Sequence, residues 1–213
     1  MSEMAEVRRA YRSIVAYERR VLEAVGRVDD LVREAGFERR ALGRGGPAER
    51  GSPGREWPGT KWAWDHVPLF AARFQWLAGG ENAAGSRYVV VDHVADTAYE
   101  RKRLEERTLT EPDMLEDLEA VAEEASRSIL RWNVVKLAAP VPANVWRSSW
   151  NDVFAKTFGA TVETFTTLAD GAAARHTSAG LELVRGGVDL SAVDSAVELE
   201  ARLLAPLRAE LGA

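Results

Sequence analysis

The segment RYVVVDHVADT, residues 87–97, predicts a β-strand, and the fold class of the chain follows from what surrounds it. Its three consecutive valines, Val89 to Val91, favour an extended backbone because β-branched side chains pack well on a pleated surface. An aromatic and apolar segment, residues 62–77, comes before it, with the loop sequence GGENAAGS between the two. We therefore predict an antiparallel hairpin.

Further segments predict additional strands. Residues 128–137 indicate a strand, with the continuation of a preceding helix as the alternative. Residues 162–171 and 178–187 indicate a second hairpin that turns at Asp170-Gly171. Strands and helices do not alternate through glycine-rich turns, so a doubly wound parallel sheet is not expected. We predict an α+β fold: a long N-terminal helix, then a mostly antiparallel sheet of about five strands with helices packed on one face.

A long helix is predicted for residues 4–35, where apolar side chains recur every three or four positions. Glu18 is the one exception in this stripe, and Gly36 supplies a C-terminal cap. At about 1.5 Å per residue the helix is about 48 Å long, which is more than a domain of this size needs. Two interpretations stay open: the stripe packs within its own chain, or it mediates self-association or docking on a partner protein. The second interpretation assigns partner binding to Val7, Tyr11, Ile14, Val21, Val25, Val28 and Val32.

The chain is predicted to have three parts. The helical part, residues 1–38, is followed by residues 39–60, which are rich in glycine, proline and arginine and predict a mobile linker. The remaining residues, 61–213, are expected to form a single α+β domain.

Three shorter helices are predicted within this domain. Thr110 caps an acidic helix, and Asn144 caps a helix whose apolar face carries four aromatic side chains. Ser191 caps the last helix, which Pro206 must kink or interrupt because proline removes a helical hydrogen bond.

The composition is that of a globular chain. Of its 213 residues, 46% are hydrophobic and 29% are charged, which excludes wholesale disorder. The absence of cysteine excludes disulfide bonds, thiolate catalysis and cysteine-ligated zinc. No apolar run reaches the roughly 18 residues of a membrane-spanning helix, and the N-terminal segment has no apolar leader. We therefore expect a cytoplasmic protein that does not associate with membranes.

Nucleic-acid binding is an alternative that the overall charge does not favour. The net charge of −5 argues against such binding by the chain as a whole. Residues 39–55, however, carry five arginines and one glutamate. Binding through this segment would use Arg39, Arg40, Arg44, Arg50 and Arg55.

His93 stands within four residues of two carboxylates, which makes it the best candidate for chemistry. Successive side chains of a strand point to opposite faces, so His93 and Asp92 are predicted to face opposite ways. Asp92 and Asp96 share a face, but about 13 Å separates them, which is too far for two ligands of one metal ion. This segment cannot build a site without residues from elsewhere.

The tripeptide Asp-His-Val occurs a second time, at residues 65–67. If the hairpin pairs Leu77 with Arg87, His93 lies opposite Ala71, and the histidine of the second tripeptide is roughly 16 Å away. The two histidines are therefore not expected to share a metal ion.

Familiar catalytic signatures are absent from the sequence: it has no phosphate-binding loop, nucleophile elbow, HExxH zinc motif or EF-hand loop. We therefore predict a non-catalytic interaction or adaptor protein, without a cofactor, that binds another macromolecule and assembles through its N-terminal helix. The alternative is a metal-dependent hydrolase or nuclease in which the fold gathers carboxylates around His93, namely Asp92, Asp96 and Asp65.

Overall fold

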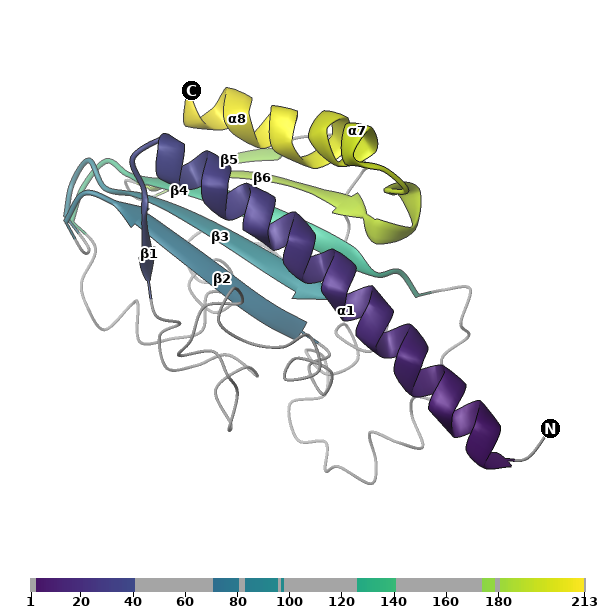
Figure 1. The fold of residues 1–213 in the computed structure, drawn as a ribbon. Coiled ribbons are helices and arrows are strands. Elements are labelled where there is room, and N and C mark those ends of the chain that lie inside the picture. The colour runs from purple at the N-terminus through teal and green to yellow at the C-terminus, as the bar shows by residue number, and fades with distance from the viewer. Residues whose placement is uncertain are drawn as a thin grey trace, which may run out of the picture.

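The computed structural model describes residues 3–40, 71–80, 83–95, 97, 126–140, 174–178 and 181–212. These residues form one antiparallel sheet of six strands, and helices lie along one of its faces (Figure 1). The elements, in chain order, are α1 (Glu3–Glu34), β1 (Glu38–Arg40), β2 (Ala71–Ala78), β3 (Arg87–Val94), β4 (Ile129–Leu137), β5 (Ala174–Ser178), β6 (Leu181–Asp189), the 3-10 turn η6 (Leu190–Ala192), α7 (Ala196–Leu199), the π-helical turn η7 (Glu200–Leu204) and α8 (Ala205–Leu211). The predicted α+β class is confirmed, with six strands instead of about five. The predicted helices that begin after Thr110 and Asn144 lie outside the described residues.

The strands lie in the order β1-β2-β3-β4-β6-β5, and each neighbouring pair is antiparallel. β2 and β3 form the predicted hairpin, but the predicted register is wrong by one residue, because Ala78 pairs with Arg87. His93 accordingly pairs with Ala72, one position beyond its predicted partner. The loop begins at Gly79, whose φ of 97° is disfavoured for other residues, so Ala78 stays in the strand.

The second hairpin joins β5 to β6, and its predicted turn is wrong. Ser178 pairs with Leu181, so the strands are connected between these residues and not at Asp170-Gly171. In this register Leu181 and Leu183 become 3% and 1% exposed on the sheet face opposite α1. The predicted strand at residues 162–171 lies outside the described residues. The predicted strand at residues 128–137 is confirmed by β4, which pairs with β3 and β6.

Helix α1 runs from Glu3 to Glu34, as its repeating apolar stripe predicts. It ends at Gly36, which has a φ of 84°, and the backbone N–H of Phe37 donates to the carbonyl of Val32 at 3.0 Å. The short strand β1 follows directly and pairs with β2 at the edge of the sheet. The first two residues of the predicted linker, Arg39 and Arg40, therefore belong to the sheet.

The C-terminal helical region begins later than predicted. Ser195 caps α7 with its hydroxyl, which accepts a hydrogen bond from the backbone N–H of Glu198 at 3.2 Å. Ser191 is not the cap, because its own N–H donates to the side chain of Asp189 at 2.9 Å within the η6 turn. The π-helical turn η7 interrupts the α-helix just before Pro206, as expected for a residue without a backbone N–H.

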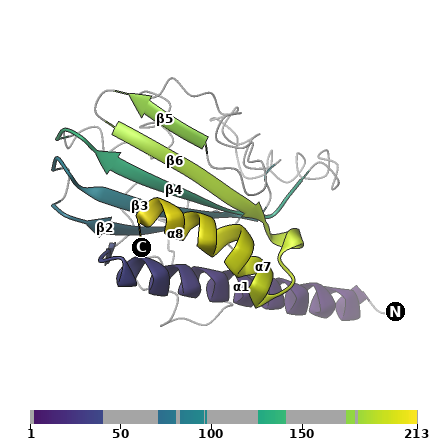
Figure 2. The same ribbon diagram turned by 90° about the horizontal axis from the view of Figure 1, so that it is seen from above.

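The main core lies between the sheet and the helices, with α1 beside the α7–α8 region (Figure 2). Trp76, Trp132 and Leu203 are among its fully buried side chains. A smaller apolar cluster, which includes Tyr88 and Val135, lies on the other face of the sheet. Successive side chains of β3 therefore point alternately into the main core and into this smaller cluster, as they must in a strand. Among the described residues, no helix has the length and apolar character needed to cross a bilayer.

Candidate functional site

The apolar stripe of α1 divides into a buried half and an exposed half. Val21, Val25, Val28 and Val32 are at most 1% exposed and pack against the sheet within their own chain. The preceding part of α1 extends beyond the sheet (Figure 1). Its four large apolar side chains form what we call the N-terminal stripe: Met4 is 60% exposed, Val7 42%, Tyr11 61% and Ile14 40%.

This division corrects the predicted partner-binding set. Val21, Val25, Val28 and Val32 cannot contact a partner because the sheet and the C-terminal helices already cover them. Charged substitutions at these positions would unfold the chain, not merely separate an assembly. Val7, Tyr11 and Ile14 remain accessible.

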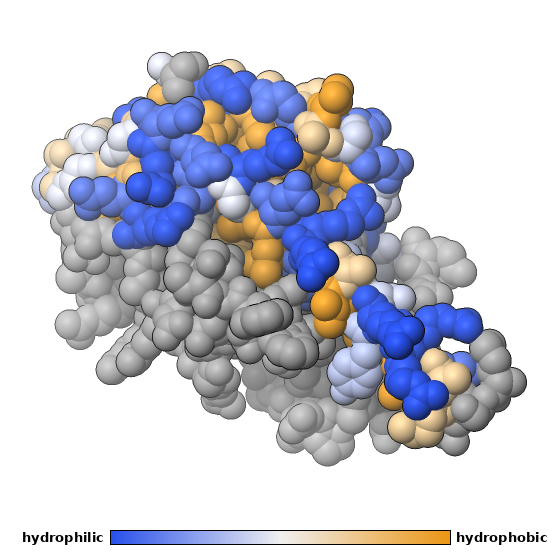
Figure 3. Space-filling view, in the orientation of Figure 1, coloured by the Kyte–Doolittle hydropathy of each residue, from blue (hydrophilic) through white to orange (hydrophobic). Residues whose placement is uncertain are grey.

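Basic side chains lie along one side of the N-terminal stripe. Arg8, Arg12 and Arg19 are exposed there, Arg9 is exposed on the opposite face of the helix, and Glu6 is the one exposed acid among residues 4–19. Figure 3 shows hydrophilic and apolar side chains side by side along the exposed helix. The stripe is therefore an apolar surface with a positive border.

Glu18 lies where the stripe passes from exposed to buried. It is 3% exposed, and burial raises the pKa of its carboxyl from 4.5 to about 8. The carboxyl is therefore protonated at neutral pH. This residue fits among the apolar side chains of α1 because its neutral form carries no charge into the interior.

Arg39 holds the end of α1 to the sheet edge. Its guanidinium binds both carboxylate oxygens of Asp29, and the indole N–H of Trp76 donates to the same carboxylate at 2.8 Å. Burial alone would raise the pKa of Asp29, but these hydrogen bonds and the charges of Arg39 and Arg33 hold it below its usual range. Among the arginines predicted to bind nucleic acid, Arg39 thus stabilises the fold and Arg40 lies in β1, while Arg44, Arg50 and Arg55 lie outside the described residues.

His93 is 1% exposed and lies on the sheet face that carries the helices. Its Nε2 is 2.7 Å from the hydroxyl of Tyr17 on α1, and the two ring centroids are 5.5 Å apart. Burial raises the pKa of Tyr17 to about 12, the hydrogen bond with Ser128 opposes the shift, and the charges of Glu18 and Asp189 add to it. Tyr17 is therefore a neutral phenol that joins α1 to β3.

The predicted carboxylates are not brought to His93 within the described part of the chain. Asp92 faces the opposite side of the sheet, as the alternation of the strand predicts. Asp65 and Asp96 lie outside the described residues. Across the described ranges, no three His, Cys, Asp or Glu side chains are grouped closely enough to hold a metal ion.

Asp92 belongs to a buried polar cluster on the face of the sheet opposite α1. Its Oδ2 is 3.5 Å from Nη2 of Arg131 and 3.5 Å from Nδ2 of Asn133. Arg185 on the neighbouring strand donates from Nε to Oδ1 of Asn133 at 3.0 Å. All four residues are at most 6% exposed, so hydrogen bonds and opposite charges offset their removal from water.

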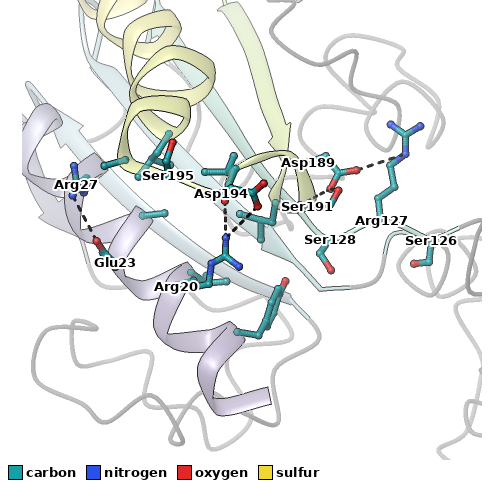
Figure 4. Close-up of a pocket in the computed structure, with 17 residues that line it drawn as sticks. Arg20, Glu23, Arg27, Ser126, Arg127, Ser128, Asp189, Ser191, Asp194 and Ser195 are labelled. Atoms are coloured by element: carbon teal, nitrogen blue, oxygen red, sulfur yellow. Dashed lines mark hydrogen bonds and ion pairs between the residues drawn. The ribbon is translucent and has the colours of Figure 1, made fainter. Parts of the chain in front are cut away.

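A cavity of about 540 Å³ opens between α1 and the segment that connects β6 to α7 (Figure 4). Tyr17 lines it on one side, and the residues that precede β4 contribute Ser126, Arg127 and Ser128. The cavity lies on the same side of the sheet as His93, with Tyr17 between the two. Among the described residues, this cavity is the concave surface next to His93.

Sequence reasoning missed Tyr17, Asp29 and the arginines of the polar cluster. Arg131 and Asn133 alternate with apolar residues in β4, which is a visible signal for a second, partly polar face. Tyr17 gave no signal, since its 76-residue separation from His93 is closed by the packing of α1 on the sheet.

The chain was compared with protein-family models, with curated proteins and with solved structures, and none of the three comparisons found a match. Function is therefore argued from the geometry of the site.

Proposed function

We propose that this chain is a non-catalytic interaction protein that binds a partner protein through the N-terminal stripe of α1. The observation that supports this proposal is the division of one continuous apolar stripe. Its second half is fully buried by the chain itself, whereas Met4, Val7, Tyr11 and Ile14 stay 40% to 61% exposed.

The exposed N-terminal half of α1 gains little stability from packing, because its large apolar side chains are not covered. Isolated helices shorter than about 12–15 residues are marginal in water, because most helical stability in proteins comes from packing of the apolar face. Fully burying a large apolar side chain contributes roughly 1.5–3 kcal/mol. A partner that covers the four stripe residues would therefore stabilise the helix and gain binding energy together.

The border of the stripe favours an acidic partner. Arg8, Arg12 and Arg19 would repel the same residues of a second copy packed against this face. A partner surface with an apolar centre and carboxylates around it matches both the stripe and its positive border. An amphipathic helix with acidic flanks has this chemistry, since helices in such contacts anchor with apolar side chains three or four positions apart.

No observation in the described residues favours the alternative of a hydrolase or nuclease, because Asp92 and His93 face opposite sides of the sheet. A cytoplasmic location, expected from the lack of cysteine, belongs to the same proposal.

Site-specific photo-cross-linking in the native host tests the proposal. A photoreactive benzoylphenylalanine replaces Tyr11 in the stripe, or Ala16 as the matched control. Ala16 is also exposed on α1 but lies about 140° around the helix. We expect a discrete adduct with a protein that carries an acidic amphipathic helix from position 11 and none from position 16.

Mass spectrometry of the adduct decides between the outcomes. An adduct that contains two copies of this chain would contradict the acidic partner and establish self-association instead. Equal adducts at both positions, or none at position 11, would remove the stripe as a docking surface.

A further inference from the structure

The cavity between α1 and the β6–α7 connection has the size of a small-molecule site. Its volume of about 540 Å³ lies within the range of roughly 300–1,000 Å³ that is typical of such sites. Two unconnected parts of the fold form its walls, α1 and the C-terminal region, and Arg20 joins them by donating to the carbonyl of Val193 at 2.7 Å. The site is thus closed at one side by a defined contact.

Part of the lining is apolar and the rest is polar. Val21, Ala24, Val193 and Leu199 supply apolar surface, and Val21, Ala24 and Leu199 belong to the buried core. Around them the cavity carries hydroxyl groups, from Tyr17, Ser126, Ser128, Ser191 and Ser195. A ligand that suits both surfaces has an apolar body and a polar head.

Three arginines line the cavity, two from α1 and one from the segment before β4. Arg20 and Arg27 come from α1, and Arg127 comes from the residues that precede β4 (Figure 4). Their ion pairs are long: 4.0 Å from Arg20 to Asp194, 3.6 Å from Arg27 to Glu23, and 4.0 Å from Arg127 to Asp189. None of these pairs has the short bidentate geometry of a strong arginine–carboxylate contact.

The three acids at the cavity do not neutralise these guanidinium groups effectively. The side chains of Glu23 and Asp194 are 67% and 85% exposed, so water screens them. The carboxylate of Asp189 has two sets of neighbours, since its Oδ1 accepts from the N–H of Ser191 at 2.9 Å and from its hydroxyl at 2.7 Å, while its Oδ2 lies 4.0 Å from Arg127. The donors of Arg27 and Arg127 can therefore turn to an anion inside the cavity, whereas Arg20 stays bound to the carbonyl of Val193.

We propose that this cavity binds a small amphipathic molecule with an anionic head group, a carboxylate or a phosphate. Arg27 and Arg127 hold the head group, and the apolar side chains of α1 and α7 receive the body. This site is separate from the N-terminal stripe, so its test does not depend on the proposed partner.

Titration calorimetry of the full chain with three probes of equal chain length tests the proposal. The probes are octyl phosphate, octanoate and octanol. We expect both anions to bind at least tenfold more tightly than octanol, because hydrogen bonds to charged groups are the stronger ones. The tighter of the two anions identifies the head group. Equal binding of octanol and the anions, or binding of none, overturns the proposal.

Variants locate the binding to this cavity. Arg27→Gln combined with Arg127→Gln should weaken octyl phosphate at least tenfold, whereas Arg33→Gln, also exposed on α1 but outside the cavity, should leave it unchanged. Ala196→Phe fills the cavity from the exposed start of α7 and should abolish binding, while Val197→Phe, which points to solvent, should not. Binding that survives Ala196→Phe places the ligand elsewhere and overturns the assignment.

Discussion

Gly186 in β6 lies beneath the indole ring of Trp132 in β4, its direct cross-strand partner. A Cβ atom at residue 186 would lie 2.2 Å from Cζ2 of Trp132, so the ring could not stay in place. Trp132 is 1% exposed, and the closely packed core around it leaves the ring little room to move. The close approach of backbone and ring explains why residue 186 is a glycine.

Gly186→Ala should therefore lower the free energy of unfolding by about 1–3 kcal/mol, the usual cost of overpacking a core. Gly26→Ala is the matched control, because no atom lies within 4 Å of its added Cβ and alanine favours the helix. Urea unfolding followed by circular dichroism compares the two variants. Equal stability of both variants would show that the indole is not confined as described.

Glu18 should make the stability of the chain depend on pH. In the folded chain its carboxyl stays protonated up to a pKa of about 8, whereas its ordinary value is 4.5. Because the unfolded state loses this proton at lower pH, the free energy of unfolding falls as the pH rises through this window and levels off above it. The whole decrease is at most roughly 5 kcal/mol.

Glu18→Gln should remove this part of the pH dependence, since the amide is neutral at every pH. Urea unfolding of both proteins near pH 5 and near pH 9 measures the difference. We expect similar stability at the lower pH and a more stable variant at the higher pH. Parallel stabilities at both values would mean that Glu18 is ionised in the folded chain.

At the scale of the element, α1 has two halves with different roles. Val25 is 0% exposed and belongs to the core, whereas Val7 is 42% exposed on the same stripe. The sequence alone could not separate these halves, because the apolar spacing continues from one into the other. The end of the sheet decides where the stripe passes from core to surface.

Val7→Asp should change the free energy of unfolding by less than about 0.5 kcal/mol, as surface substitutions usually do. Val25→Asp should prevent folding, since it places a carboxylate in an apolar interior. Thermal unfolding followed by far-ultraviolet circular dichroism distinguishes them. A large loss of stability in Val7→Asp would indicate that the N-terminal half of α1 is already packed within its own chain.

The junction of α1 with β1 rests on Asp29. Asp29→Asn should lower the free energy of unfolding by about 1–3 kcal/mol near neutral pH, because the charge-assisted bonds from Arg39 are lost. The pKa of Asp29 is depressed, so its contribution is present above its ordinary value of 3.8 and is lost as the pH falls through the folded pKa. Urea unfolding at neutral and acidic pH checks this, and equal stability of Asp29→Asn and the parent chain at neutral pH would contradict it.

Local patterns predicted much of the whole molecule. The spacing in α1, the valines of β3 and the alternation in β4 were sufficient to predict the α+β class and the opposite orientations of Asp92 and His93. The turn of the second hairpin was predicted wrongly, because the pairing of β5 with β6 places it directly after Ser178, while the predicted strand at residues 162–171 lies outside the described residues.

The cavity could not be predicted for a related reason. Tyr17, Arg127 and Val193 are far apart in the sequence and meet only when α1 packs beside the C-terminal helices. The Tyr17–His93 contact also depends on this packing. Sites made from distant elements leave no spacing signal along the chain, whereas each strand and helix does.

The described residues form a sheet with helices along one face and a helix end that extends past the sheet (Figure 1). The proposed docking surface is this extended end, residues 4–14, whereas residues 21–34 pack in the core. Amide hydrogen–deuterium exchange of α1 is measured in the isolated chain and in the complex recovered by cross-linking at position 11. We predict fast exchange of residues 4–14 and slow exchange of residues 21–34 in the isolated chain, with protection of residues 4–14 in the complex. Exchange of residues 4–14 that is already as slow as that of residues 21–34 in isolation, or unchanged by the partner, would contradict the proposal.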